Sequence, residues 1–291
     1  MQILFNGSKS KVLAMLFVLL SSQVRAEKID LTTADSLPFV NTSAKQKWDE
    51  YVAAKGNKAY AISETGAWAS RKDQSSEDEA RQKALAACEK YGSPCALFAL
   101  NDEKVWTTEY NVASILKSAK RILKNAKLES EYGKEKETSM FVGPTDKIKS
   151  DDKFHSMTPP TIPGGKTLST SELRDLLVAE KPPVLIDVLP ADTERTTIFG
   201  AEILANAGFG DHETSKERVL KFEEVVLETI GGNKETAVVF FCQGFECWYS
   251  YNAALRAIKL GFKNVMWYRG GVQAWRAAAL PQSRSKAKIK L

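Results

Sequence analysis

Two cysteines, Cys242 and Cys247, are the residues of this chain best suited to nucleophilic chemistry. They lie five positions apart, and Trp248 follows the second. The thiolate rather than the thiol is the nucleophile. A cysteine between a strand and a helix N-terminus faces free backbone N–H groups and the positive end of the helix dipole, and both favour the thiolate. The position of Cys242 therefore predicts a reactive sulfur.

The sequence patterns on either side of this loop predict the elements that position it. The apolar run 236–241 predicts a buried strand, and residues 249–260 predict a helix that Gly261 ends. Further strands are expected at 183–188 and 265–268. Helices are expected to begin near Ser169, to span 216–230 and to include Trp275. Such alternation predicts an α/β fold with a parallel sheet covered on both faces, and ligands bind at the carboxyl ends of its strands.

Four segments in order carry a resemblance to a known family. Residues 184–188 (VLIDV) resemble the opening strand of rhodanese (sulfurtransferase) domains, and residues 198–201 (IFGA) resemble their Ile-Pro-Gly-Ala turn. Residues 261–265 (GFKNV) and 270–275 (GGVQAW) are similar to the close of such domains. The resemblance covers about residues 165–282. It implies a rhodanese-like fold.

The second cysteine, Trp248 and the segments 189–191 and 250–254 narrow the resemblance. Together they look like a periplasmic rhodanese-like group named for a Cys-x-x-Cys-Trp motif and associated with PQQ-dependent alcohol catabolism. In this chain four residues separate the cysteines instead of two. The likeness to that group implies either an enzyme or a non-enzymatic accessory or sensor of periplasmic PQQ-dependent alcohol oxidation.

A rhodanese-like activity implies that Cys242 takes sulfur from a donor and holds it as a persulfide, which a second nucleophile then removes. Backbone N–H groups of the loop would stabilise the anionic sulfur as an oxyanion hole stabilises charge. Asp187 is expected to organise the loop backbone. The expected substrate-binding positions are Gln243, Gly244, Phe245, Glu246 and Trp248.

The loop departs from the family pattern in ways that bear on the donor. Thiosulfate-using loops usually carry Arg or Lys, whereas this loop has neither and carries Glu246. Leu189 stands where the family commonly has an arginine, and the usual histidine before the 198–201 turn is absent. A negative charge repels an anionic donor and disfavours the thiolate. A donor other than thiosulfate is therefore expected, such as a persulfide or another small sulfur compound.

Cys247 leaves three interpretations open. It could resolve a Cys242 persulfide or sulfenate by forming a disulfide, which makes the pair a thiol–disulfide redox site. The two cysteines could instead form an inert disulfide. Phe245 and Trp248 could wall an apolar pocket or cap the core.

No metal or other cofactor is expected at this loop. Two thiols without a neighbouring histidine are an incomplete ligand set for zinc. The two histidines of the chain, His155 and His212, are isolated in the sequence and are interpreted as surface residues.

The N-terminus predicts export. Lys9 and Lys11 precede the apolar stretch 12–20, and residues 24–26 offer small residues for cleavage after Ala26. An anchor is the alternative, but a hydrocarbon core needs about 20 apolar residues. A periplasmic mature chain without a transmembrane segment is the prediction, with a small sulfur substrate or a periplasmic protein as its partner.

An exported chain permits disulfides. Cys88 and Cys95 flank a turn between a predicted helix and a predicted strand, and their spacing suits a structural disulfide. Strands are expected at 58–63, 67–69, 95–100 and 104–106, with a helix starting at residues 75–78. The result is a small α+β domain of hairpin, helix and hairpin. It resembles a secreted bacterial module of unknown function.

Residues 112–128 place apolar side chains at helical spacing with lysines opposite. This helix either lies on a membrane surface or, as we favour, packs on a neighbouring domain. The Pro-, Gly- and Ser-rich stretch that follows predicts a linker that partly wraps the second domain. The expected division is a signal peptide at 1–26, a small domain at 27–110, a helix and linker at 111–164, a rhodanese-like domain at 165–282 and a basic tail at 283–291.

Charge excludes one class of partner. The formal net charge is +5, and removal of the predicted signal peptide takes away three basic residues and no acid, leaving about +2. So small a charge does not indicate a nucleic-acid-binding protein.

Overall fold

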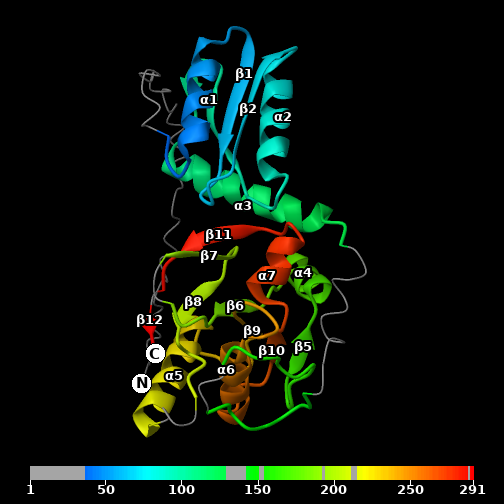
Figure 1. Cartoon of the computed structure of the whole chain (residues 1–291), viewed down its shortest axis with the longest axis vertical. Coiled ribbons are helices and arrows are strands. Elements are labelled where there is room, and N and C mark those ends of the chain that lie inside the picture. Colours follow the sequence, from blue (N-terminus) through cyan, green and yellow to red (C-terminus); the bar gives the residue numbers. More distant parts are fainter. Residues whose placement is uncertain (1–36, 129–141, 151–153, 192–193, 211–214, 288) are drawn as a thin grey trace, which may run out of the picture.

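The computed structural model of the chain describes residues 37–128, 142–150, 154–191, 194–210, 215–287 and 289–291. The predicted signal peptide and His212 lie outside these residues. A small α+β domain is followed by a larger α/β domain, and helix α3 lies between them (Figure 1). This arrangement confirms the fold class expected from the sequence.

The small domain is an antiparallel sheet in the order β2-β1-β3-β4. Its elements are α1 (Thr42–Ala53), β1 (Asn57–Ile62), β2 (Trp68–Gln74), α2 (Glu77–Glu89), β3 (Ala96–Leu100) and β4 (Glu103–Lys104). Helix α1 was not expected, because only Ala44, Trp48 and Tyr51 of its residues are buried and the apolar repeat is weak. Trp48 packs edge-on against Tyr60 and forms one core of this domain.

The predicted disulfide between Cys88 and Cys95 is present. It joins the end of α2 to the start of β3 across a Cα–Cα distance of 6.2 Å. Both cysteines are buried against the alanine-rich face of α2. Because a small domain buries little apolar surface, the crosslink contributes to its stability.

Helix α3 (Thr108–Asn125) packs against protein. Ile115, Ala119 and Leu123 are buried, and Leu123 belongs to a core cluster of the α/β domain. This confirms the packed-helix interpretation. The helix begins four residues earlier than expected, because the hydroxyl of Thr107 accepts the backbone N–H of Tyr110 and caps it. Within the described part of the chain, no helix is both long and apolar enough to span a membrane.

The α/β domain contains a sheet of parallel-paired strands in the order β12-β8-β6-β9-β10-β5. Its strands are β5 (Lys166–Leu168), β6 (Val184–Asp187), β8 (Glu202–Ala205), β9 (Val238–Phe241), β10 (Val265–Tyr268) and β12 (Ile289–Lys290). Its helices are α4 (Thr170–Val178), α5 (Lys216–Thr229), α6 (Trp248–Lys259) and α7 (Gly271–Ala277).

Alternating side chains of the central strand β9 build the two faces of this sheet. Val238 and Phe240 belong to the core cluster that contains residues of α5 and α6, whereas Val239 and Phe241 belong to the cluster that contains residues of α4 and α7. A strand buried on both faces reads as a continuous apolar run, which is why β9 could be predicted. Cys242 follows directly after the carboxyl end of β9 and therefore lies at the edge of the sheet.

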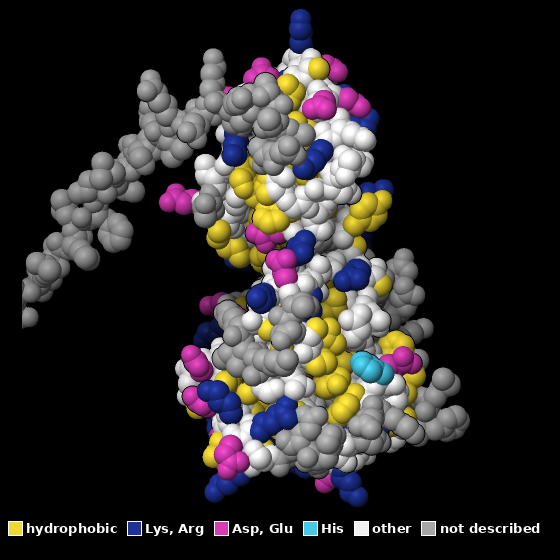
Figure 2. Space-filling view, turned by 60° about the vertical axis from the view of Figure 1, so that its left-hand side comes forward, with side chains coloured by type: hydrophobic (Ala, Val, Ile, Leu, Met, Phe, Trp, Pro, Cys, Tyr) yellow, Lys and Arg dark blue, Asp and Glu magenta, His cyan; other side chains and the backbone are white. Residues whose placement is uncertain are grey.

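The segment expected as a basic tail is packed on this domain. β11 (Gln282–Ser285) pairs antiparallel with β7 (Arg195–Ile198), and β12 adds to β8. On the face drawn in Figure 2, Lys and Arg side chains alternate with Asp and Glu side chains instead of gathering in one basic patch.

Candidate functional site

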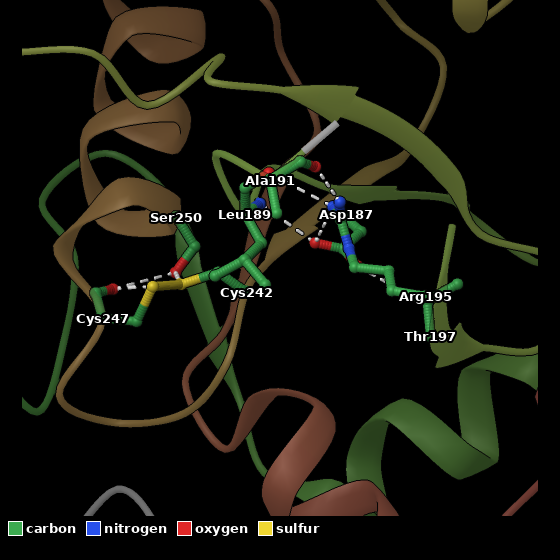
Figure 3. Close-up of polar contacts among 8 residues, drawn as sticks. All are labelled: Asp187, Leu189, Ala191, Arg195, Thr197, Cys242, Cys247 and Ser250. Carbon is green, nitrogen blue, oxygen red and sulfur yellow. Dashed lines mark hydrogen bonds and ion pairs between the residues drawn. A yellow bond between two sulfur atoms is a disulfide. The ribbon is translucent and has the colours of Figure 1, made fainter. Parts of the chain in front are cut away.

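The candidate site is the loop between β9 and α6, where Cys242 and Cys247 form a disulfide (Figure 3). Their Cα atoms are 6.3 Å apart, and Cys247 is the N-cap of α6. The side chains are 1% and 2% exposed, respectively. Of the states that the sequence left open, the structure contains the bonded pair, so all four cysteines of the chain are in disulfides.

The start of α7 fixes the backbone of this loop. Val272 N–H donates to the carbonyl of Cys242 (2.9 Å), and Gln273 N–H donates to that of Gln243 (3.0 Å). Gly271 has φ +60°, and a Cβ there would lie 2.5 Å from the carbonyl oxygen of Cys242. Only glycine lets the helix end approach so closely. The loop carbonyls therefore point toward α7.

Ser250 lies beside the sulfur of Cys242. Its Oγ is 3.2 Å from Cys242 Sγ and 3.3 Å from the carbonyl oxygen of Cys247. Trp267 Nε1–H donates to the same Oγ (3.0 Å), which leaves the hydroxyl proton of Ser250 for the sulfur or the carbonyl. Ser250 and Trp267 are buried, so water does not compete for these contacts. Neither residue was among the site residues predicted from the sequence.

The other predicted binding positions point in different directions. Gln243 and Gly244 lie against α7, while Phe245 and Glu246 are exposed. Trp248 is buried and packs edge-on against Tyr251, so it caps the core.

The expected cradle of backbone N–H groups is partly used within the protein. Cys247 N–H donates to Gly244 O, and Trp248 N–H donates to Phe154 O (both 3.0 Å). These two donors face carbonyl oxygens in the disulfide-bonded loop.

Residues 154–158, hereafter the cover segment, lie across the outside of the loop. Its Phe154 carbonyl accepts the N–H of Trp248, and His155 forms an antiparallel bridge with Cys247. Thr158 donates both its N–H and its hydroxyl to the carbonyl of Phe245. The predicted wrapping of the second domain by the linker is thus seen at the candidate site itself.

Arg269, the residue after β10, binds the cover segment through Thr158. Its side chain is fully buried, donates to the hydroxyl and carbonyl oxygens of Thr158, and lies 5.9 Å from the ring centroid of Phe245. Burial lowers the pKa of the Arg269 guanidinium from its ordinary value. Arg269 lies 22 positions after Cys247 and shares no sequence motif with the loop, so this cation could not be predicted from the loop sequence.

Two residues of α6 hold the preceding stretch of chain. Tyr251 donates its hydroxyl to Thr145 O (2.8 Å), and Asn252 pairs with the N–H and carbonyl of Lys149. Burial raises the pKa of Tyr251 above its ordinary value, so its hydroxyl keeps the proton that it donates. Residues 250–254, which contribute to the narrower family resemblance, thus connect the cysteine loop to the linker.

Asp187 organises a loop next to the disulfide (Figure 3). Its buried carboxylate accepts the N–H of Leu189 (3.0 Å) and the hydroxyl of Thr197 (2.7 Å), and it pairs with Arg195 (3.1 Å). Arg195 also donates to the carbonyl of Leu189. The expected backbone-organising role fits these contacts, while Arg195 was missed because Leu189 occupies the position where an arginine was sought.

This geometry defines an α/β domain with a cysteine loop at the carboxyl edge of a parallel sheet. Residues 169–278 match the family described as Rhodanese-like domain, and this part of the chain has the rhodanese-like fold. The match covers less than half of the chain and includes Asp187, both loop cysteines and Arg269. No curated protein matches the chain.

Solved structures with a likeness to the chain include three proteins. A complex of EanB with hercynine is 19% identical over 41% of this chain and 31% of that one, with a TM-score of 0.32. The homodimeric polysulfide-sulfur transferase of Wolinella succinogenes is 18% identical over 41% and 78%, with a TM-score of 0.30. The thiosulfate sulfurtransferase of Pseudomonas aeruginosa is 21% identical over 43% and 21%, with a TM-score of 0.30. The chain spans less than a third of the EanB and Pseudomonas proteins.

Proposed function

We propose that this protein is an exported rhodanese-like sulfurtransferase that carries sulfur as a persulfide on Cys242. The observation that carries the proposal is the position of Cys242 in the rhodanese-like domain, directly after β9 and before the N-terminus of α6. The helix dipole and the neighbouring Ser250 hydroxyl favour an anionic sulfur there once the disulfide is opened.

Charges around the loop support a donor other than thiosulfate. The exposed part of the loop presents Phe245 and Glu246, an apolar ring and a carboxylate. Two cations lie near the loop among the described residues: the guanidinium of Arg269 is buried and directed at Thr158, and the ammonium of Lys149 lies over the ring of Trp248, 4.8 Å from its centroid. A doubly charged anion gains little beside Glu246, whereas a persulfide, or an arenethiosulfonate with its single charge and apolar ring, depends less on a basic clamp.

Export of the protein belongs to the same proposal. The predicted signal peptide and the two disulfides both fit an oxidising compartment such as the periplasm. An association with PQQ-dependent alcohol oxidation, as an accessory or sensor, is the non-enzymatic alternative. A second alternative is a protein that exchanges disulfides through Cys242 and Cys247, and the buried disulfide between these two residues supports it.

The first test is the redox state of the loop in protein recovered from the periplasm of an expression host. Alkylation and intact mass, followed by peptide mapping, distinguish a free or persulfidated Cys242 from a disulfide. A disulfide that opens with a mild dithiol keeps the enzyme proposal. A disulfide that resists dithiol in the folded protein overturns it and leaves the scaffold alternative.

The second test is sulfur transfer to cyanide from thiosulfate, benzenethiosulfonate and glutathione persulfide. Cyanide takes the outer sulfur of the persulfide as thiocyanate and returns the Cys242 thiolate, so thiocyanate counts turnovers. Thiocyanate should form faster from the last two donors, and Cys242→Ser should abolish it. Equal formation by Cys242→Ser and the wild type contradicts the proposal.

A further inference from the structure

Cys247 is placed to act on any sulfur that Cys242 acquires. The native fold brings the two sulfur atoms to bonding distance within one short loop, and Cys247 needs no other element to reach Cys242. A nucleophile held beside its target reacts far faster than one that must arrive from solution. Cys247 is therefore the first nucleophile that a Cys242 persulfide meets.

External acceptors have a harder route to the same sulfur. Cys242 is 1% exposed, and the cover segment is hydrogen-bonded to both Phe245 and Trp248 on the outer side of the loop. The carbonyl of Cys242 is bound to α7. A large acceptor thus reaches the persulfide only if the cover segment moves, whereas Cys247 already lies inside it.

We propose that this site reduces sulfane sulfur to sulfide, with Cys247 resolving the Cys242 persulfide and a dithiol renewing the pair. The inference rests on the proposed persulfide function and names its product and its co-substrate class. It differs from a transferase reaction, in which the sulfur atom passes to an external acceptor.

Each step balances. The Cys242 thiolate attacks the outer sulfur of a donor such as benzenethiosulfonate, and benzenesulfinate leaves with the electron pair of the broken S–S bond. The Cys247 thiolate, its proton passing to the departing sulfur, then attacks Cys242 Sγ. A Cys242–Cys247 disulfide forms and hydrosulfide is released. The cysteine pair is oxidised by two electrons and the sulfane sulfur is reduced by two. An external dithiol reduces the disulfide and becomes a disulfide itself.

Ser250 and Trp267 serve the renewal step. When the cover segment moves and a dithiol attacks Cys247 Sγ, the sulfur of Cys242 leaves as a thiolate. The Ser250 hydroxyl, 3.2 Å away and fixed by Trp267 Nε1–H, donates a hydrogen bond to that charge. A stabilised thiolate is the better leaving group. This contact favours Cys242 as the sulfur that is released and recharged.

The test is a single turnover without oxygen. The full-length mature protein is reduced with dithiothreitol, freed of reductant and mixed with benzenethiosulfonate, a donor that brings no sulfide of its own. Sulfide is trapped with monobromobimane, and the cysteine state is read by alkylation and peptide mass. The wild type should release about one sulfide per chain and regain the Cys242–Cys247 disulfide, because each chain holds one such pair. Cys247→Ser should instead keep the added sulfur atom on Cys242 and release at least tenfold less sulfide.

Two variants serve as controls. Cys88→Ser/Cys95→Ser lacks the other disulfide and should release as much sulfide as the wild type, which shows that those thiols are not the source. Cys242→Ser should neither take up sulfur nor release sulfide. Circular dichroism confirms that each variant is folded.

The outcomes separate the inference from the proposed function beneath it. A wild-type protein that keeps a stable persulfide on Cys242 and releases no sulfide overturns the reductase inference and leaves sulfur transfer intact. Absence of sulfur uptake by both the wild type and Cys247→Ser overturns both. Sulfide release by Cys247→Ser at the wild-type level also contradicts the inference.

Discussion

The guanidinium of Arg269 donates to both oxygen atoms of Thr158, 3.2 Å to the hydroxyl and 2.9 Å to the carbonyl. Thr158 in turn donates to the carbonyl of Phe245. A buried cation at the end of β10 thereby holds the cover segment against the cysteine loop. The contact joins the linker to the sheet across 111 positions of sequence.

Arg269→Gln should loosen this cover. The shorter neutral side chain cannot reach both oxygens, so buried groups lose partners and the free energy of unfolding should fall by about 1–3 kcal/mol. The Cys242–Cys247 disulfide should then be reduced by dithiothreitol several-fold faster in the native protein, as measured by timed alkylation.

Two controls distinguish local opening from general weakening. Arg276→Gln changes an exposed arginine of α7 and should leave the reduction rate unchanged. Leu173→Ala removes core packing on α4 without touching the loop, and should destabilise the domain without the same gain in rate. If Arg269→Gln is reduced no faster than the wild type, the cover does not limit access.

The Asp187–Arg195 pair should matter for stability far more than a surface ion pair. Asp187 is 1% exposed, and Arg195→Gln leaves this buried carboxylate without its partly buried cation. We expect the free energy of unfolding to fall by about 3–5 kcal/mol in denaturant titrations. Arg284→Gln breaks the exposed pair with Glu194 and should cost about 1 kcal/mol or less. Equal losses in the two variants would show that burial of the Asp187 pair adds nothing.

Gly271→Ala should disturb the cysteine loop through its backbone. The new Cβ would lie 2.5 Å from the carbonyl of Cys242, on a residue whose φ is +60°. Positive φ costs an alanine about 1 kcal/mol, and the clash adds about 1–3 kcal/mol. Gly231→Ala is a matched control, because Gly231 has φ +79° but no neighbour within 4 Å of the added atom. Thermal unfolding of both variants measures the clash alone, and an equal loss would refute it.

The elements of the α/β domain that could be predicted are those buried on both faces or strongly periodic. The run around β9 and the helix α6 have such patterns, and the cysteines between them located the loop. Strands β7 and β11 read RTTI and QSRS, polar sequences that form strands only because they pair with each other. Their pairing is tertiary, so local propensity gave no signal.

The same reason explains which site residues were missed. Cys242 and Cys247 carry chemistry in their residue type and spacing, whereas Arg269 and Arg195 acquire importance from partners that the fold supplies. Ser250 could have been found by helical geometry, because it is the third residue of a helix whose N-cap is Cys247. Side chains in the first turn lie close to the loop that precedes the helix.

Ser250→Ala should lower the reactivity of the Cys242 thiolate. In a Cys247→Ser background Cys242 is free, and the Ser250 hydroxyl is the neighbour that can donate to its sulfur while Trp267 supplies the second bond to the hydroxyl oxygen. Loss of one such hydrogen bond costs about 1 kcal/mol, so alkylation by iodoacetamide at neutral pH should slow several-fold and its pH profile should move upward. Ser283→Ala, on β11, is the control and should leave the profile in place. Trp267→Phe should move the profile in the same direction by a smaller amount, since it only frees the hydroxyl to turn away. A profile that Ser250→Ala leaves unmoved would mean that Cys242 draws its reactivity from the α6 dipole alone.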